Sequence, residues 1–243
     1  MKICKLNATD STSLYLKELM LSEPLEDFTV VTAKKQLKGR GQMGTLWESE
    51  VASNLTFSVF KKLDALPVSN QFMISICVSI GIYKALKKLQ IPEVSIKWPN
   101  DILSGNQKVC GVLIENVLSG NKIQASILGI GLNVNQINFE NLPRATSLKL
   151  LMGESFNLDE VLHVVLDSIE NQFSLLNMET EKEIRISYEK LLFRKGKPST
   201  FKNKKGELFM GFISGISAEG KLVVTLEDGI SSTFNLKEIE LLY

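Results

Sequence analysis

The chain has 243 residues, of which 44% are hydrophobic, so it can bury a sizeable core and still leave residues for a small second domain. Its 28 Lys and Arg residues balance 27 Asp and Glu residues, and the net charge of +1 excludes an overall field that attracts nucleic acid or membranes. The opening MKICKLNATDSTS lacks the apolar run of a signal peptide, and no stretch approaches the roughly 18 apolar residues of a membrane span. We therefore expect a cytoplasmic protein.

Three cysteines and one histidine limit the chemistry further. Cys4, Cys77 and Cys110 are odd in number and widely spaced, which fits neither a disulfide framework nor a zinc site. His163 lies in a strongly periodic helical segment with no nucleophile motif beside it, so a structural role is favoured. The sequence predicts reduced thiols and no histidine-based nucleophile.

The first half of the chain alternates short β-rich segments with one long helical segment. A glycine-containing segment at 36–47 is predicted to be a loop between two strands. Apolar residues recur every three or four positions from about 70 to 89, which predicts a helix that ends before Pro92. The expected strands lie at 28–35, 54–60, 94–98, 108–115 and 124–134.

The second half contains two predicted helices and a β-rich tail. The segment 157–176 carries one apolar stripe, and Asn157 with Glu160 supplies a cap. Thr180 and Glu183 match a capping box for a further helix that ends near 194–195. Turn signals then recur at short intervals, which predicts a small β-barrel and a domain boundary between 195 and 196. These turn signals lie at 203–206, 218–220 and 227–229.

Three glycines surround one arginine in the segment KGRGQMGTLW at 38–47. Glycines expose backbone N–H groups and allow the Arg40 guanidinium to approach phosphate oxygens, which indicates a flexible anion-binding loop. An ordinary turn explains the same residues, and the segment does not open a helix as a dinucleotide fingerprint requires. The residues alone leave both interpretations open.

A second motif, KWPNDI at 97–102, precedes a short turn and the segment KVCGVLIE at 108–115. Lys97 and Lys108 can then approach one anionic ligand, while Asp101 offers a carboxylate to a metal or an amine. The alternative is a surface hairpin with a solvated Lys–Asp pair, worth at most ~1 kcal/mol. Trp98 fits either the core or a ligand platform.

These motifs and their order resemble the catalytic domain of biotin protein ligases. The matching segments are DSTS at 10–13, Gln36 with GRGQMGTLW at 39–47, KWPNDI at 97–102, KVCGVLIE at 108–115 and GIGLNVN at 129–135. The β-rich tail resembles the small SH3-like domain of the same family. The resemblance implies an α+β fold with two domains. Residues 1–195 would form a mixed β-sheet domain of the class II aminoacyl-tRNA synthetase and biotin ligase type, flanked by helices, and 196–243 an SH3-like β-barrel.

The resemblance also implies which residues hold biotin. Ser13 replaces the usual asparagine, so the hydrogen bond there is expected to reach less far or to pass through water. Gln42 and Thr45 stand where many family members carry arginine, which leaves open how tightly the enzyme would retain its biotinyl-adenylate intermediate. The implied biotin-binding residues are Ser11, Thr12, Ser13, Gln36, Gly39, Arg40, Gly41, Gln42, Lys108 and Gly111.

For the nucleotide, the resemblance implies that Lys108 bridges the biotin carboxylate and the α-phosphate. Asp101 would bind Mg²⁺ or position the incoming amine. The implied ATP-binding residues are Arg40, Trp47, Lys97, Asn100, Lys108 and Asn133, and the implied catalytic residues are Lys108, Arg40, Asp101 and Lys97.

The implied reaction consumes biotin and MgATP, forms biotinyl-5'-AMP, and biotinylates a lysine of a biotin carboxyl carrier protein in a carboxylase such as acetyl-CoA carboxylase. Repressor members carry a helix-turn-helix domain ahead of the catalytic part, and this chain begins almost at DSTS, so we expect no DNA binding. A homodimer, the identity of the carboxylase and a redox role for Cys110 remain open. A lipoate protein ligase of the same fold and an inert scaffold with a protein-binding tail are the alternatives. Thermal shifts with biotin and lipoate, and ATP–pyrophosphate exchange, would separate them.

Overall fold

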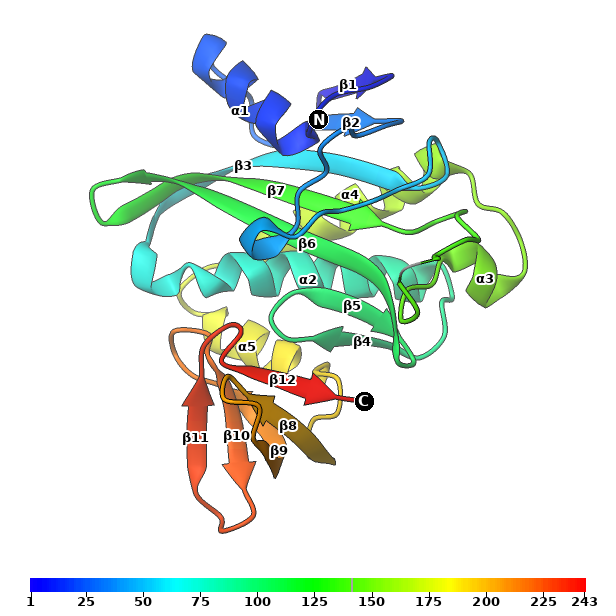
Figure 1. Ribbon diagram of the computed structural model, residues 1–243. Coiled ribbons are helices and arrows are strands. Elements are labelled where there is room, and N and C mark those ends of the chain that lie inside the picture. Colours follow the sequence, from blue (N-terminus) through cyan, green and yellow to red (C-terminus); the bar gives the residue numbers. More distant parts are fainter. Residues whose placement is uncertain (141) are drawn as a thin grey trace.

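The larger part of the molecule is built on a seven-stranded mixed sheet, with the strands in the order β1-β2-β3-β7-β6-β5-β4 (Figure 1). The computed structural model describes residues 1–140 and 142–243. β1 and β2 run parallel, and the other neighbouring strands are antiparallel. The strands are β1 (Ile3–Leu6), β2 (Thr29–Ala33), β3 (Leu55–Pro67), β4 (Val94–Lys97), β5 (Asp101–Ser104), β6 (Gln107–Ser119) and β7 (Lys122–Leu132).

Two long helices cover one face of this sheet. α2 (Phe72–Lys88) and α4 (Leu158–Ser174) pack against each other, and both contribute to the main core together with alternate residues of the central strands, such as Val112, Leu128 and Ile130. The sequence prediction of both helices is confirmed to within two residues at each end. Short helices complete this part of the chain: α3 (Leu148–Met152), α5 (Glu181–Lys190) and the 3-10 turns at Gln42–Gly44 and Val68–Asn70.

The opposite face of the sheet is only partly covered. α1 (Thr12–Ser22) lies over its β2, β3 and β7 strands and forms a second, smaller core with Leu16, Val31, Phe60 and Ile127. The sequence did not predict α1, because its start consists of buried hydroxyl residues and no side chain caps it. Beyond α1 this face carries small residues, and it is there that a cavity opens.

The β-rich tail forms a separate five-stranded antiparallel sheet in the order β11-β10-β9-β8-β12. Turns lie at the three places that the sequence indicated, and Gly206, Gly220 and Gly229 adopt positive φ in them. This sheet agrees with the expected SH3-like fold, whereas the boundary at 195 and 196 stays a prediction. Its strands are β8 (Pro198–Asn203), β9 (Leu208–Ile216), β10 (Leu222–Leu226), β11 (Ser231–Phe234) and β12 (Ile239–Leu242).

Side-chain hydrogen bonds hold the small sheet against the larger part. Trp98 Nε1 donates to the Gly220 carbonyl at 2.8 Å, and Arg185 Nη1 of α5 donates to the Ser217 carbonyl at 2.9 Å. Trp98 is therefore a half-buried residue that joins the two sheets. No helix in the described part of the chain has the length and apolarity needed to cross a membrane.

One of the two predicted helix caps is wrong. Asn157 caps α4 as expected, because its Oδ1 accepts from Asp159 N at 2.9 Å and Glu160 N at 3.4 Å. Thr180 does not form the predicted capping box with Glu183, since its backbone is already helical at φ −93° and ψ −12°. Its hydroxyl donates instead to the carbonyl of Leu175 in the preceding turn.

Candidate active site

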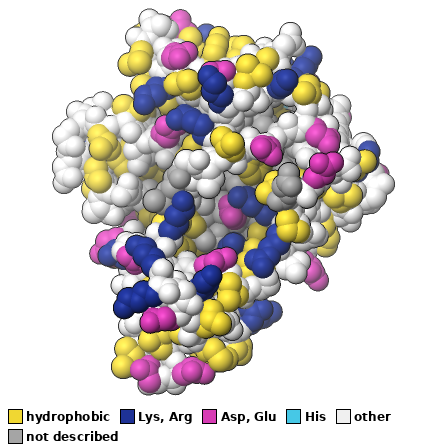
Figure 2. Space-filling view, viewed as in Figure 1, with side chains coloured by type: hydrophobic (Ala, Val, Ile, Leu, Met, Phe, Trp, Pro, Cys, Tyr) yellow, Lys and Arg dark blue, Asp and Glu magenta, His cyan; other side chains and the backbone are white. Residues whose placement is uncertain are grey.

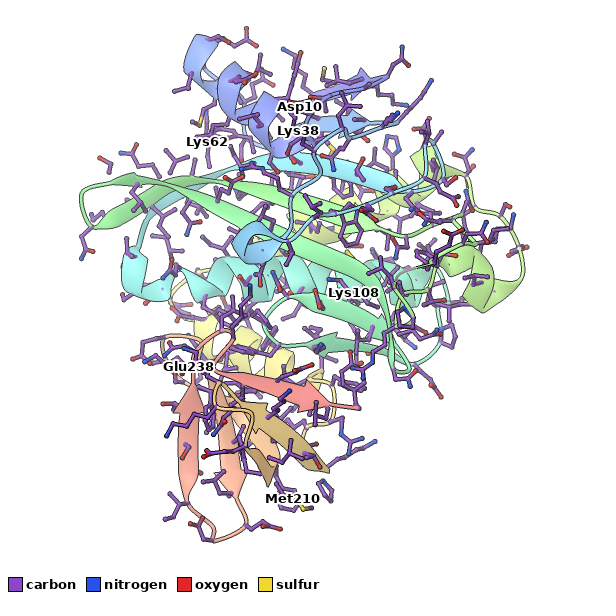
Figure 3. All side chains as sticks on the ribbon, viewed as in Figure 1. Asp10, Lys38, Lys62, Lys108, Met210 and Glu238 are labelled. Atoms are coloured by element: carbon purple, nitrogen blue, oxygen red, sulfur yellow. The ribbon has the colours of Figure 1, made fainter. Side chains whose placement is uncertain are left out.

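A cavity of about 600 Å³ lies between the open face of the large sheet and the small sheet. This volume falls in the range of roughly 300–1,000 Å³ that small-molecule sites occupy. Figure 2 shows Lys and Arg side chains gathered around a hollow in the middle of the molecule. Both sheets contribute to the wall, and Figure 3 places Lys108 on the large-sheet side and Glu238 on the small sheet.

Glycines on two neighbouring strands form the floor of the cavity beneath Trp47. Gly111 of β6 and Gly131 of β7 are directly paired. A Cβ atom added at Gly131 would lie 2.2 Å from Cε2 of the Trp47 indole, and one at Gly111 would lie 2.9 Å from its Cζ3. The indole can occupy this place only because both positions lack side chains. Its Nε1 is buried, and no described residue accepts a hydrogen bond from it.

Hydroxyl and amide groups converge at one end of the cavity. The Thr12 backbone N and Oγ1 donate to Gln36 Oε1 at 2.8 and 3.1 Å. Ser58 Oγ of β3 lies 2.8 Å from Thr12 Oγ1 and 2.9 Å from Ser13 Oγ. Sequence reasoning missed Ser58, although a lone serine between Phe57 and Val59 in a buried strand is a usable signal.

The loop that carries Arg40 is folded back on itself. Gly41 N donates to the Thr45 carbonyl at 2.7 Å, and Trp47 N donates to the Gly39 carbonyl at 3.0 Å. The Arg40 guanidinium forms an ion pair with Glu115 of β6, with 2.7 Å between Nη2 and Oε2. Because the Arg40 side chain is 41% exposed, this pair is a weak tether that a ligand anion can displace.

The charged end of the cavity holds Lys108, Asp101 and Lys97. Lys108 Nζ lies 2.7 Å from Asp101 Oδ1, and the two side chains are 35% and 27% exposed. Lys97 of β4 pairs in register with Asp101 of β5. The Lys108 ammonium also lies 5.5 Å from the Trp47 ring centroid. The structure thus brings together the three charged residues that the sequence singled out in two separate motifs.

Two of the predicted site residues do not line the cavity. Gly39 lies behind the loop, where an added Cβ would meet the Trp47 carbonyl at 2.1 Å. Asn133 is buried and its Nδ2 donates to the Thr146 carbonyl at 3.0 Å, so its contact with a nucleotide stays a prediction. Asn100 lines the wall but also donates to the Val112 carbonyl. The other predicted residues in the wall are Ser11, Thr12, Ser13, Gln36, Arg40, Gly41, Gln42, Trp47, Lys97, Asp101, Lys108 and Gly111.

Cys110 points away from the cavity. Its side chain is fully buried in the core beneath α2 and α4. Burial raises the pKa of this thiol far above its ordinary value, although the nearby Lys108 ammonium acts in the opposite direction. The thiol therefore faces the core and is not part of the cavity wall.

The wall offers little to a resident metal ion. Within residues 1–140 and 142–243, no three His, Cys, Asp or Glu side chains are grouped to hold one. Asp101 supplies a single carboxylate, and Mg²⁺ is commonly held by one or two carboxylates together with substrate phosphates and water. The donor set therefore fits a magnesium ion that arrives with a nucleotide.

Comparison with known proteins decides the family. Residues 6–133, more than half of the chain, match the Biotin/lipoate A/B protein ligase family. The chain belongs to this family. Among curated family members, the bifunctional ligase/repressor BirA of Bacillus subtilis is 28% identical over 217 residues, covering 88% of this chain and 66% of BirA. The biotin--[acetyl-CoA-carboxylase] ligase of Mycobacterium tuberculosis is 32% identical over 143 residues, covering 58% of this chain and 52% of that ligase.

Solved structures of family members share the whole fold. The biotin protein ligase from Aquifex aeolicus in complex with biotin and ATP superimposes with a TM-score of 0.80 at 28% identity, covering 99% of this chain and 98% of that one. The expected fold class is thereby confirmed. The chain spans just under two thirds of the length of the Bacillus relatives.

Proposed function

We propose that the protein is an ATP-dependent biotin protein ligase. It activates biotin as biotinyl-5'-AMP and transfers the biotinyl group to a lysine of a biotin carboxyl carrier domain. The observation that carries this proposal is one cavity with a hydroxyl and amide array at one end and Lys108 and Asp101 at the other, with Arg40 in the same wall. Biotin has the matching polarity, with a ureido ring at one end and a carboxylate at the other.

The hydroxyl and amide end suits the ureido ring. That ring offers two N–H donors and one carbonyl acceptor, and hydroxyl groups can serve as partners of either kind. Ser11, Thr12 and Ser13 are each less than 5% exposed, so their hydrogen bonds form away from competing water. A Cβ at Gly129 would lie 2.7 Å from Ser13 Oγ, so the glycine leaves room for this hydroxyl against the strand.

In the first step, an oxygen of the biotin carboxylate forms a bond to the α-phosphorus of ATP, and the bond to the bridging oxygen of pyrophosphate breaks. Lys108 and Arg40 stabilise the negative charge that is shared between carboxylate and phosphate. Both cations start from weak ion pairs, with Asp101 and Glu115, which the incoming anions replace. Mg²⁺ bound to the phosphates would be held on the protein side by Asp101 and would offset their charge.

In the second step, the amine of the acceptor lysine forms a bond to the acyl carbon and AMP leaves. The ordinary pKa of a lysine amine is about 10.4, so the amine must lose a proton to react. Asp101, once released from Lys108, is placed to orient the amine or to accept its proton. Closure of the 36–47 loop over the cavity keeps water from the anhydride between the two steps.

The partner is proposed from the chemistry of the relatives. The Mycobacterium tuberculosis relative is named for biotin and acetyl-CoA carboxylase, so we assign this chain a biotin carboxyl carrier domain as its acceptor. With a net charge of +1, we propose ligation without DNA binding. A homodimer and a cytoplasmic location stay predictions.

Mass spectrometry of an acceptor domain tests the proposal. The purified protein is incubated with biotin, MgATP and the domain, and we expect the domain to gain one biotinyl group. An acceptor with its lysine changed to arginine is the control and must gain nothing. Absence of both biotin-dependent ATP–pyrophosphate exchange and the mass gain would refute the proposal. Lipoate is the matched competitor, because the family includes lipoate ligases; a lipoyl gain in place of a biotinyl gain would show the alternative activity.

A further inference from the structure

The aromatic ring of Tyr243 contacts two cations, one of which, Lys97, lines the charged end of the cavity. Lys97 Nζ is 4.9 Å from the ring centroid, and Arg144 Cζ is 4.5 Å from it. Both distances are within the roughly 6 Å at which a cation is attracted to an aromatic face. Tyr243 follows strand β12 of the small sheet, whereas both cations belong to the larger part of the chain.

The position of Tyr243 is fixed relative to the backbone of Lys97. Its ring packs edge-on against Phe193, with centroids 5.0 Å apart at 66°. Phe193 N donates to the carbonyl of Ile96, the residue before Lys97, at 2.8 Å. The preceding residue, Leu242, pairs with Thr200 of β8. The ring is therefore held by the small sheet on one side and by the edge of β4 on the other.

Arg144, the second cation beside the ring, is linked through its backbone to the second lysine of the site. Lys108 N donates to the Arg144 carbonyl at 2.6 Å, and Thr146 N donates to the Lys108 carbonyl at 3.0 Å. The ring thus contacts Lys97 directly and reaches Lys108 through one backbone hydrogen bond.

The Lys97 ammonium has the Tyr243 ring as its neighbour in place of a carboxylate. Within residues 1–140 and 142–243 it forms no ion pair, whereas Lys108 is paired with Asp101. A lysine side chain left free in water loses much rotamer freedom when it meets a phosphate, and that loss weakens binding. A ring that already confines the ammonium reduces the loss before the nucleotide arrives.

We propose that Tyr243 is a positioning residue that holds Lys97 toward the phosphates of ATP. This assignment rests on the proposed function, since it takes the charged end of the cavity as the nucleotide side. Tyr243 acts through Lys97 and does not touch the reacting atoms. Part of the affinity for ATP therefore depends on a residue that follows the small sheet.

Replacement of the ring tests the assignment. Tyr243→Leu keeps an apolar contact with Phe193 but removes the aromatic face, and we expect KM for ATP to rise about 3- to 10-fold. KM for biotin should change by less than about 2-fold, because the hydroxyl and amide end lies at the far side of Trp47. Tyr243→Phe keeps the ring and should restore the wild-type KM for ATP. A rise of both KM values together, or a Phe variant as weak as the Leu variant, would overturn the assignment.

A double-mutant cycle with Lys97→Met separates an effect of Tyr243 that acts through Lys97 from a general loss of structure. Binding of a non-hydrolysable ATP analogue is measured by calorimetry with saturating biotin, so the result does not depend on ligase turnover. If Tyr243 acts through Lys97, the loss of affinity from Tyr243→Leu disappears once Lys97 is methionine. Independent, additive losses would refute it. Failure of the proposed function is distinguishable, because it appears as absent biotin-dependent exchange in the wild-type protein.

Discussion

Gly131→Ala tests the packing of Trp47 on the cavity floor. The new methyl group would lie 2.2, 2.4 and 2.6 Å from three atoms of the indole, whereas carbon atoms in contact lie about 3.5–4.0 Å apart. The ring must therefore move by about 1 Å or more, and overpacking of this kind costs about 1–3 kcal/mol. For a chain of this length we expect the melting temperature to fall by about 2–12 °C. Adenylation should fall with it, because Trp47 lies against Lys108.

Removing the indole provides the control. In a Trp47→Ala background the methyl group at position 131 has no ring to displace, so Gly131→Ala should then cost little stability. Differential scanning calorimetry of the wild-type protein, both single variants and the double variant measures this coupling. Equal losses of stability from Gly131→Ala in the two backgrounds would refute the steric argument. Gly111→Ala should displace the ring less, because its added Cβ would lie 2.9 Å from the nearest indole atom.

Three further outcomes are expected. Lys108→Ala should lower biotin-dependent ATP–pyrophosphate exchange by roughly 10²-fold or more, with an unchanged melting temperature, because it removes a cation that stabilises the transition state; wild-type turnover would exclude Lys108 from the mechanism. Arg40→Gly should release biotinyl-adenylate and biotinylate lysines of an added bystander protein, since the loop loses its contact with the anion; labelling confined to the acceptor domain would contradict this. Cys110 should resist alkylation by iodoacetamide at neutral pH in the folded protein, because burial raises its pKa, whereas the partly exposed Cys4 should react. Peptide mass spectrometry distinguishes the two thiols. Alkylation of Cys110 would show that the core opens.

Local patterns were sufficient for much of the fold and half of the site. The periodicity of α2 and α4 and the turn signals of the tail depend on neighbouring residues, so the sequence displays them directly. Lys97, Asp101 and Lys108 come together because short turns join their three strands, which is also visible in the sequence. The Asn157 cap was predicted correctly for the same reason, whereas Thr180 does not cap because its own backbone is helical.

The remainder depends on contacts between distant segments. Ser58 joins the hydroxyl cluster only because β3 lies beneath the start of α1. The role of Glu115 as partner of Arg40 requires the loop to fold across β6, and no spacing rule predicts that. The wall supplied by the small sheet, including Lys202 and Glu238, follows from how the two parts dock, which hydrophobic periodicity does not reveal.

The shared cavity wall has a consequence for redesign. Residues of the large sheet and of 201–204 and 236–241 face the same space, so a compound that fills it touches both parts at once. Binding of the compound then stabilises the docked arrangement of the two parts by RT ln(1 + [L]/Kd), where [L] is its free concentration and Kd its dissociation constant. Exchanging the tail for that of a relative would replace one part of the cavity wall without changing the part that faces it. A chimera that accepts a new substrate therefore needs matched changes in two regions nearly 200 positions apart, such as 11–13 with 201–204.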